Sequence, residues 1–185
     1  LTVSIPGTPY ANDWQIWVYP PILDTAPTEG VLVTRALDDQ AETQLKQGGN
    51  VLLLPRPSAI DGDTSGSFEP VFWNRLWFPT QEVHTLGLLC NPQHPALAEF
   101  PTDTHSNWQW WDLCKHSKPM ILDELPADLA PIVQAIDDWN TCRKLGLVLE
   151  AQVEQGKLVV SAIDLVTDLE QRPVDGHLAI EAGDL

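Results

Sequence analysis

The sequence predicts a domain of the α/β class, built on a mostly parallel sheet covered by helices and followed by a C-terminal β-hairpin. A β-branched run, a helical segment and an apolar run follow one another over 31–55, which is the order of a β-α-β unit. The runs at 50–55 and 85–90 are continuously apolar, as is typical of strands buried on both faces. Two β-favouring runs around a glycine turn at 145–165 predict the hairpin.

In the first half of the chain, alternating side chains predict a strand at 12–19, ended by two prolines. The β-α-β unit consists of a strand at 31–35, a helix at 38–46 and a strand at 50–55. Acidic residues open this helix, Lys46 lies in its last turn and a Gly pair follows it, as favourable helix ends require.

After this unit, the sequence predicts a loop at 56–70, an aromatic segment of unassigned backbone at 71–79 and a strand at 85–90. A short helix begun by proline follows at 94–100, and then an aromatic helix at 105–113, capped by Ser106. The last predicted elements are a strand at 118–123, a helix at 130–139 and the hairpin at 145–165. The helix at 130–139 is predicted from apolar residues at helical spacing. The tail at 166–185 has little apolar periodicity, which predicts either a poorly ordered end or the remnant of a terminal helix.

Length and charge narrow the class of protein. The 185 residues support one domain over 1–185, and 43% hydrophobic residues with eight Trp exclude a wholly disordered chain. Ten basic against 26 acidic residues give a net charge of −16, which repels nucleic acid and anionic lipid. The chain contains no apolar run of membrane-spanning length, so neither nucleic acid nor membrane is an expected partner.

Motifs for catalysis or cofactor binding are absent from the sequence. The His and Cys residues match no compact metal-site spacing, so neither a metal nor another cofactor is expected. Cys90 follows a predicted strand and is a candidate nucleophile, but no glycine flanks it and Pro92 removes an amide donor, which favours a buried structural thiol. Adjacent acids such as Asp137 and Asp138 are interpreted as a solvated surface.

The most unusual stretch runs from His105 to Leu113 and contains three Trp residues. One interpretation is a platform on which a sugar ring stacks, with neighbouring polar side chains binding its hydroxyls. The candidate residues for this site are His105, Asn107, Trp108, Trp110 and Trp111. The competing interpretation is packing in the core or against another domain, with Trp108 and Trp111 on one helix face and Trp110 on another.

Five segments together resemble the C-terminal region of bacterial glycoside hydrolases of family 2, of the β-galactosidase and β-glucuronidase type. These segments are 11–20, 72–74, 94–97, 105–113 and 144–147 with the hairpin that follows. The resemblance extends over about residues 10 to 165, and the segment 105–113 is its most specific part.

This resemblance implies a three-layer, flavodoxin-like or class I glutamine-amidotransferase-like fold. It also implies a non-catalytic accessory domain that supports interdomain packing, oligomer assembly or the substrate entrance. In that family the catalytic glutamates lie in a (β/α)8 barrel upstream, so no catalytic residue is expected here and the partners are other domains of the parent enzyme. The parent is expected to be secreted or periplasmic, and Leu1 in place of Met fits a chain cut from it. A carbohydrate-binding module and a hydrolase or amidotransferase using Cys90 are the alternatives.

Overall fold

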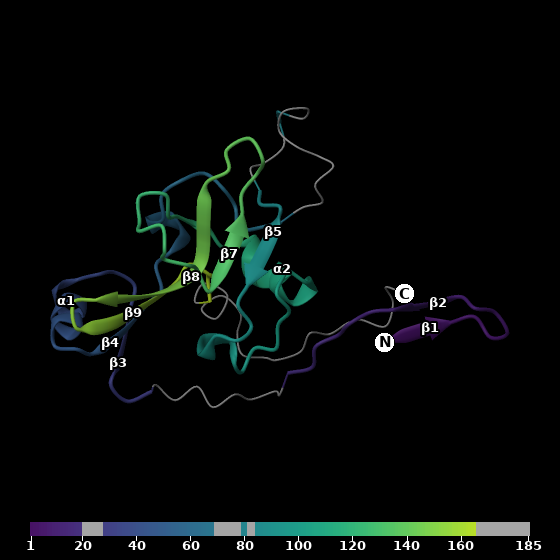
Figure 1. Cartoon of the computed structure of the whole chain (residues 1–185), viewed down its shortest axis with the longest axis horizontal. Coiled ribbons are helices and arrows are strands. Elements are labelled where there is room, and N and C mark those ends of the chain that lie inside the picture. The colour runs from purple at the N-terminus through teal and green to yellow at the C-terminus, as the bar shows by residue number, and fades with distance from the viewer. Residues whose placement is uncertain (20–27, 69–78, 81–83, 166–185) are drawn as a thin grey trace. The chain divides into compact units, whose positions relative to one another are not determined.

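The computed structural model describes residues 1–19, 28–68, 79–80 and 84–165, which fall into an N-terminal unit and a main unit (Figure 1). Most of the predicted aromatic segment at 71–79 and the predicted tail at 166–185 lie outside these residues.

The N-terminal unit is a small hairpin. Strands β1 (Thr2–Ser4) and β2 (Ala11–Asp13) pair antiparallel, and the Trp14 amide donates to the Leu1 carbonyl at 2.8 Å. The predicted strand at 12–19 overlaps β2 only at Asn12 and Asp13.

The described part of the main unit contains a mixed sheet of seven strands. Its strands are β3 (Val31–Thr34), β4 (Asn50–Leu53), β5 (Gly87–Cys90), β6 (Met120–Ile121), β7 (Val133–Ile136), β8 (Lys144–Val153) and β9 (Gly156–Ser161). The order is β3-β4-β9-β8-β7-β5, with β6 also paired to β8. Only the β3–β4 and β4–β9 pairs are parallel, and the other pairs are antiparallel.

The predicted β-α-β unit is confirmed. Helix α1 (Asp39–Lys46) connects β3 to β4, and these two strands pair in parallel. The Asp38 carboxylate caps the helix by accepting a hydrogen bond from the Ala41 amide at 2.9 Å. The buried side chains of Ala41 and Leu45 then face the parallel part of the sheet.

The three-layer, mostly parallel, flavodoxin-like fold is a wrong prediction. The described residues contain only two α-helices, α1 and α2 (Trp108–Lys115), each of eight residues, and two short 3-10 helices, Pro57–Ala59 and Pro95–Leu97. Two helices of this length do not cover both faces of a seven-stranded sheet, and four of its six neighbouring pairs are antiparallel.

The predicted helix at 130–139 is also wrong, since Val133–Ile136 is strand β7. Val133 and Ala135 are fully buried, whereas Gln134 and Ile136 between and after them are partly exposed. This period of two, with β5 on one side and β8 on the other, satisfies the backbone through the sheet. Long-range pairing therefore overrides the local helical spacing.

The predicted C-terminal hairpin is confirmed, with β8 and β9 joined at Glu154-Gln155. β8 is long enough to join the two parts of the sheet, because Val148 lies opposite both Val133 of β7 and Ser161 of β9. Gly156 is required at the start of β9, where a Cβ atom would lie 2.4 Å from the Gly49 carbonyl oxygen.

Two clusters of buried side chains form the core. One lies where α2 meets β5, β7 and the start of β8, and includes Leu88, Trp110, Cys114, Val133 and Leu147. The other lies between α1 and strands β4, β8 and β9, and includes Leu45, Val51, Leu149, Leu158 and Val160. Each short helix thus covers one part of the mixed sheet.

Candidate functional site

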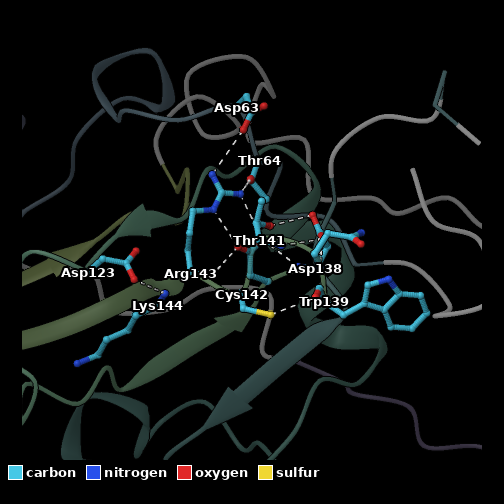
Figure 2. A network of polar contacts seen from close by, with 11 residues as sticks. Asp63, Thr64, Asp123, Asp138, Trp139, Thr141, Cys142, Arg143 and Lys144 are labelled. Carbon is cyan, nitrogen blue, oxygen red and sulfur yellow. Dashed lines mark hydrogen bonds and ion pairs between the residues drawn. The ribbon is translucent and has the colours of Figure 1, made fainter. Parts of the chain in front are cut away.

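A charged network lies at the loop between β7 and β8, and Figure 2 shows its polar contacts. The Asp137 side chain is 1% exposed. One of its oxygens, Oδ2, accepts from both the backbone amide and Nε of Arg143 at 2.8 Å, and Nη2 reaches Oδ1 at 3.2 Å. Arg143 Nη2 also donates to Thr64 Oγ1 at 2.5 Å, and Nη1 lies 3.6 Å from the Asp63 carboxylate.

Asp138 shapes the same loop from the other side. Its carboxylate accepts from the Asn140 amide at 2.6 Å and from the Thr141 hydroxyl at 3.0 Å. Cys142 adopts a left-handed conformation with φ of 54°, and its thiol donates to the Trp139 carbonyl at 3.2 Å. These contacts close a tight turn that carries Arg143 back over Asp137.

The electrostatics of this network indicate a structural role. Burial by itself raises the pKa of the Asp137 carboxyl, but hydrogen bonds from the Arg143 side chain and backbone outweigh it and hold the pKa below its ordinary value. Asp137 is therefore ionised at neutral pH, and both of its carboxylate oxygens accept hydrogen bonds from Arg143. The interpretation of Asp137 as part of a solvated surface is wrong, because this residue is buried. The Arg143 side chain that compensates its charge lies six residues further along the chain.

Cys90 lies at the end of β5 in the core, 8% exposed. Burial raises its pKa to about 11, with a hydrogen bond to Thr102 acting in the opposite direction and Asp103 adding to the increase. Cys114 of α2 is fully buried, and burial raises its pKa to about 12. Both thiols are protonated at neutral pH, which removes the nucleophilic form that a cysteine enzyme requires.

Alkylation of the native chain tests this assignment. We expect iodoacetamide at pH 8 to label Cys142, the exposed cysteine, and to leave Cys90 and Cys114 unmodified until denaturant is added. Peptide mass spectrometry identifies the labelled residue, and a Cys142→Ser variant provides the matched blank. Rapid labelling of Cys90 in the folded protein would instead support a cysteine nucleophile.

The tryptophan segment forms α2, and its first turn separates the three rings as the helix period predicts. Asn107, rather than the predicted Ser106, is the N-cap, since its side-chain oxygen accepts from the Gln109 amide at 3.2 Å. Trp110 is 1% exposed, donates from Nε1 to Thr102 Oγ1 at 2.7 Å and packs edge-to-face on Phe100. Its buried position makes Trp110 a core residue.

Trp108 and Trp111 lie on the other face of α2. Trp108 is 75% exposed and makes an edge-to-face contact with Trp111, with ring centroids 6.0 Å apart. Trp111 is half-buried and packs in the same way on Phe68. His105, which is exposed and lies just before α2, forms an isolated antiparallel β-bridge with Leu89 of β5. The structure thus places Trp108, Trp111 and Asn107 together, whereas Trp110 and Cys90 belong to the core.

Among the residues that the structure describes, no group of three or more His, Cys, Asp or Glu side chains is arranged to hold a metal ion. Neither α-helix in this part of the chain is long and apolar enough to cross a membrane.

The comparison with known proteins gives one family. No curated protein matches the chain. A model described as a domain of unknown function, DUF8487, matches residues 32–181, which includes every strand of the mixed sheet except the first residue of β3. The chain therefore belongs to the DUF8487 family.

Proposed function

We propose that this chain is a non-catalytic accessory domain of a larger carbohydrate-active enzyme of the family 2 glycoside hydrolase type, and that its N-terminal unit packs against another domain of that enzyme. The observation that carries the proposal is the exposure of the apolar side chains in 1–19. Eight large ones are between 47% and 88% exposed: Leu1, Val3, Ile5, Tyr10, Trp14, Ile16, Val18 and Tyr19.

This exposure is unusual for an isolated protein surface. A two-stranded hairpin by itself is marginally stable in water, and a contiguous apolar patch generally marks an interaction surface. Val3, Ile5, Tyr10 and Trp14 line a shallow apolar hollow on the hairpin. Asp13 is the only acidic or basic side chain among residues 1–19, so burying this surface requires little desolvation of charge.

Beyond β2, Trp14, Ile16 and Val18 are exposed, and so are Gln15 and Tyr19. In an extended segment Trp14, Ile16 and Val18 share one face, because successive side chains point to opposite sides. The expected partner surface is therefore an antiparallel sheet that accepts residues 14–19 at its edge and buries these three side chains.

The chemistry of the main unit supports a non-catalytic role. Cys90 is protonated at neutral pH and Asp137 is held by Arg143, so these groups contribute to structure. The family 2 parent is supported by the sequence resemblance of 94–97, 105–113 and 144–147. In the structure, these segments form the 3-10 helix at Pro95–Leu97, the start of α2 and the start of β8.

The gene tests the parentage directly. We expect the reading frame upstream of Leu1 to encode a (β/α)8 barrel carrying the catalytic glutamates. An initiation codon immediately before Leu1 would overturn the proposal.

In that parent enzyme, Ile16→Asp with Val18→Asp is expected to release this domain, because two carboxylates cannot be buried unpaired at the interface. Limited proteolysis, read by the rate at which the domain is cut free, measures the effect. Val33→Asp on β3 is the matched control, since Val33 has a similar exposure of 53% but lies in the main unit. Equal cutting of both variants would contradict a docking role for residues 1–19.

A further inference from the structure

We propose that Trp108 and Trp111 form a binding site for a neutral sugar ring on the surface of the main unit. This goes beyond the accessory role, because packing through residues 1–19 gives no function to an exposed aromatic surface on α2. The site consists of Trp108, Trp111, His105, Asn107 and Asp103.

The aromatic part of the site is supported from beneath. Phe68 packs on Trp111 with ring centroids 5.5 Å apart at 84°, and Trp111 packs on Trp108 at 6.0 Å and 70°. Trp108 is therefore braced by Trp111, which Phe68 supports in turn, while Trp108 keeps 75% of its surface exposed. A braced indole loses little rotamer freedom when a ligand stacks on it, which is the advantage of a preorganised site.

Polar groups suited to hydroxyls lie beside the indole along the chain. The Asn107 oxygen is used for the helix cap, but its amide nitrogen makes only a long contact of 3.5 Å with Asp103 Oδ2. Asp103 and His105 are both exposed. In this proposed site the Asp103 carboxylate, the Asn107 amide and the His105 imidazole, from the residues that precede Trp108 in the chain, provide acceptors and donors for sugar hydroxyls, while the indole receives the apolar C–H face of the ring.

Charge determines which sugars fit. The Asp103 carboxylate contacts the side chain of Asn107, the residue directly before Trp108, and the chain carries a net charge of −16. Lys115 at the other end of α2 is paired with Asp112. The site therefore disfavours uronates and phosphorylated or sulfated sugars, and the expected ligand is a neutral oligosaccharide.

Calorimetric titration of the complete chain with neutral β-linked galacto-, gluco- and manno-oligosaccharides tests the proposal. Saturable binding of at least one is expected, with no binding of the matching glucuronate oligosaccharide. Loss of the aromatic face in Trp108→Ala is expected to weaken binding roughly tenfold. Trp108→Phe, which keeps a ring, is expected to retain part of the affinity.

Trp139→Ala is the matched control, since Trp139 is 47% exposed but lies on the loop between β7 and β8. Its affinity is expected to equal that of the unaltered chain. Urea midpoints establish that each variant is folded. The proposal is overturned if the folded chain binds none of the neutral oligosaccharides, if glucuronates bind equally well, or if Trp139→Ala loses as much affinity as Trp108→Ala. These results are independent of the gene structure that tests the accessory role.

Discussion

Replacement of Arg143 by Ala is expected to lower the free energy of unfolding by about 3–5 kcal/mol, the cost of leaving a buried charge without its partner. The Asp137 side chain is only 1% exposed and receives three hydrogen bonds from Arg143, two of which come from the guanidinium. In the Ala variant the guanidinium bonds are lost and water has little access to the carboxylate. The same change releases Thr64, which is 4% exposed.

Urea denaturation followed by circular dichroism measures this loss. Arg143→Lys keeps the charge but not the planar pair of donors, so an intermediate loss is expected. Lys157→Ala is the control for removing an ordinary ion pair. Lys157 lies 3.1 Å from Glu150 and is 52% exposed, so its replacement is expected to cost about 0–1 kcal/mol. Equal losses in Arg143→Ala and Lys157→Ala would show that the network contributes no more than a surface pair.

The pH dependence of the unfolding free energy provides a second measure of the same network. The pKa of Asp137 is lower in the folded than in the unfolded chain, so its ionised form stabilises the fold above the unfolded value, about 3.9. This stabilisation is lost as the pH falls through the lower folded pKa. Without Arg143, burial of the carboxyl favours its neutral form instead. The difference in unfolding free energy between the unaltered chain and Arg143→Ala is therefore expected to shrink as the pH is lowered below 4.

Local sequence patterns predicted those parts of the fold whose partners are close in sequence. The β3-α1-β4 unit depends on the Asp38 cap, the paired Ala41 and Leu45 and the glycines that follow, all within one short segment. The β8–β9 hairpin depends on a two-residue turn. In both cases the pattern and the contact it predicts lie in the same few residues.

The mixed topology depends instead on pairings between distant segments. Residues 132–136 carry apolar side chains that satisfy both a helical period and a strand period. The segment forms a strand because β5 and β8 provide backbone hydrogen-bond partners on both sides of β7. The parallel pairing predicted from 31–55 was assumed for the whole sheet. That prediction is wrong for β5, β7 and β8, which pair antiparallel.

The charged network also escaped prediction because it depends on residues that are distant in the sequence. The burial of Asp137 depends on a turn that returns Arg143 over it and on Thr64, which lies 79 residues from Arg143 in the sequence. One signal was available in the sequence, namely an Arg directly before β8 and one residue ahead of its apolar run. A cation at the start of a buried strand generally requires a carboxylate partner, and Asp137 precedes it on the adjoining strand end.

Replacement of Trp110 by Ala is expected to lower the free energy of unfolding by about 3–5 kcal/mol, as is typical of a large aromatic removed from a core. Trp110 is 1% exposed, packs on Phe100 with ring centroids 4.8 Å apart and donates to Thr102 Oγ1. Its removal leaves a cavity beneath α2 and takes away the N–H donor whose hydrogen bond Thr102 Oγ1 accepts. Trp108→Ala, two residues earlier in the same helix, removes the same atoms from an exposed position.

For Trp108→Ala a change within about 0.5 kcal/mol is expected, because exposed substitutions rarely affect stability. The two variants separate the packing role of the tryptophan segment from its proposed sugar-binding role. Trp110→Ala measures packing, whereas Trp108→Ala leaves packing intact and removes the proposed sugar surface. Urea midpoints of both variants, measured in parallel, decide between them. Equal losses would mean that Trp108 is a packing residue, and a stable Trp110→Ala variant would mean that α2 does not depend on its buried ring.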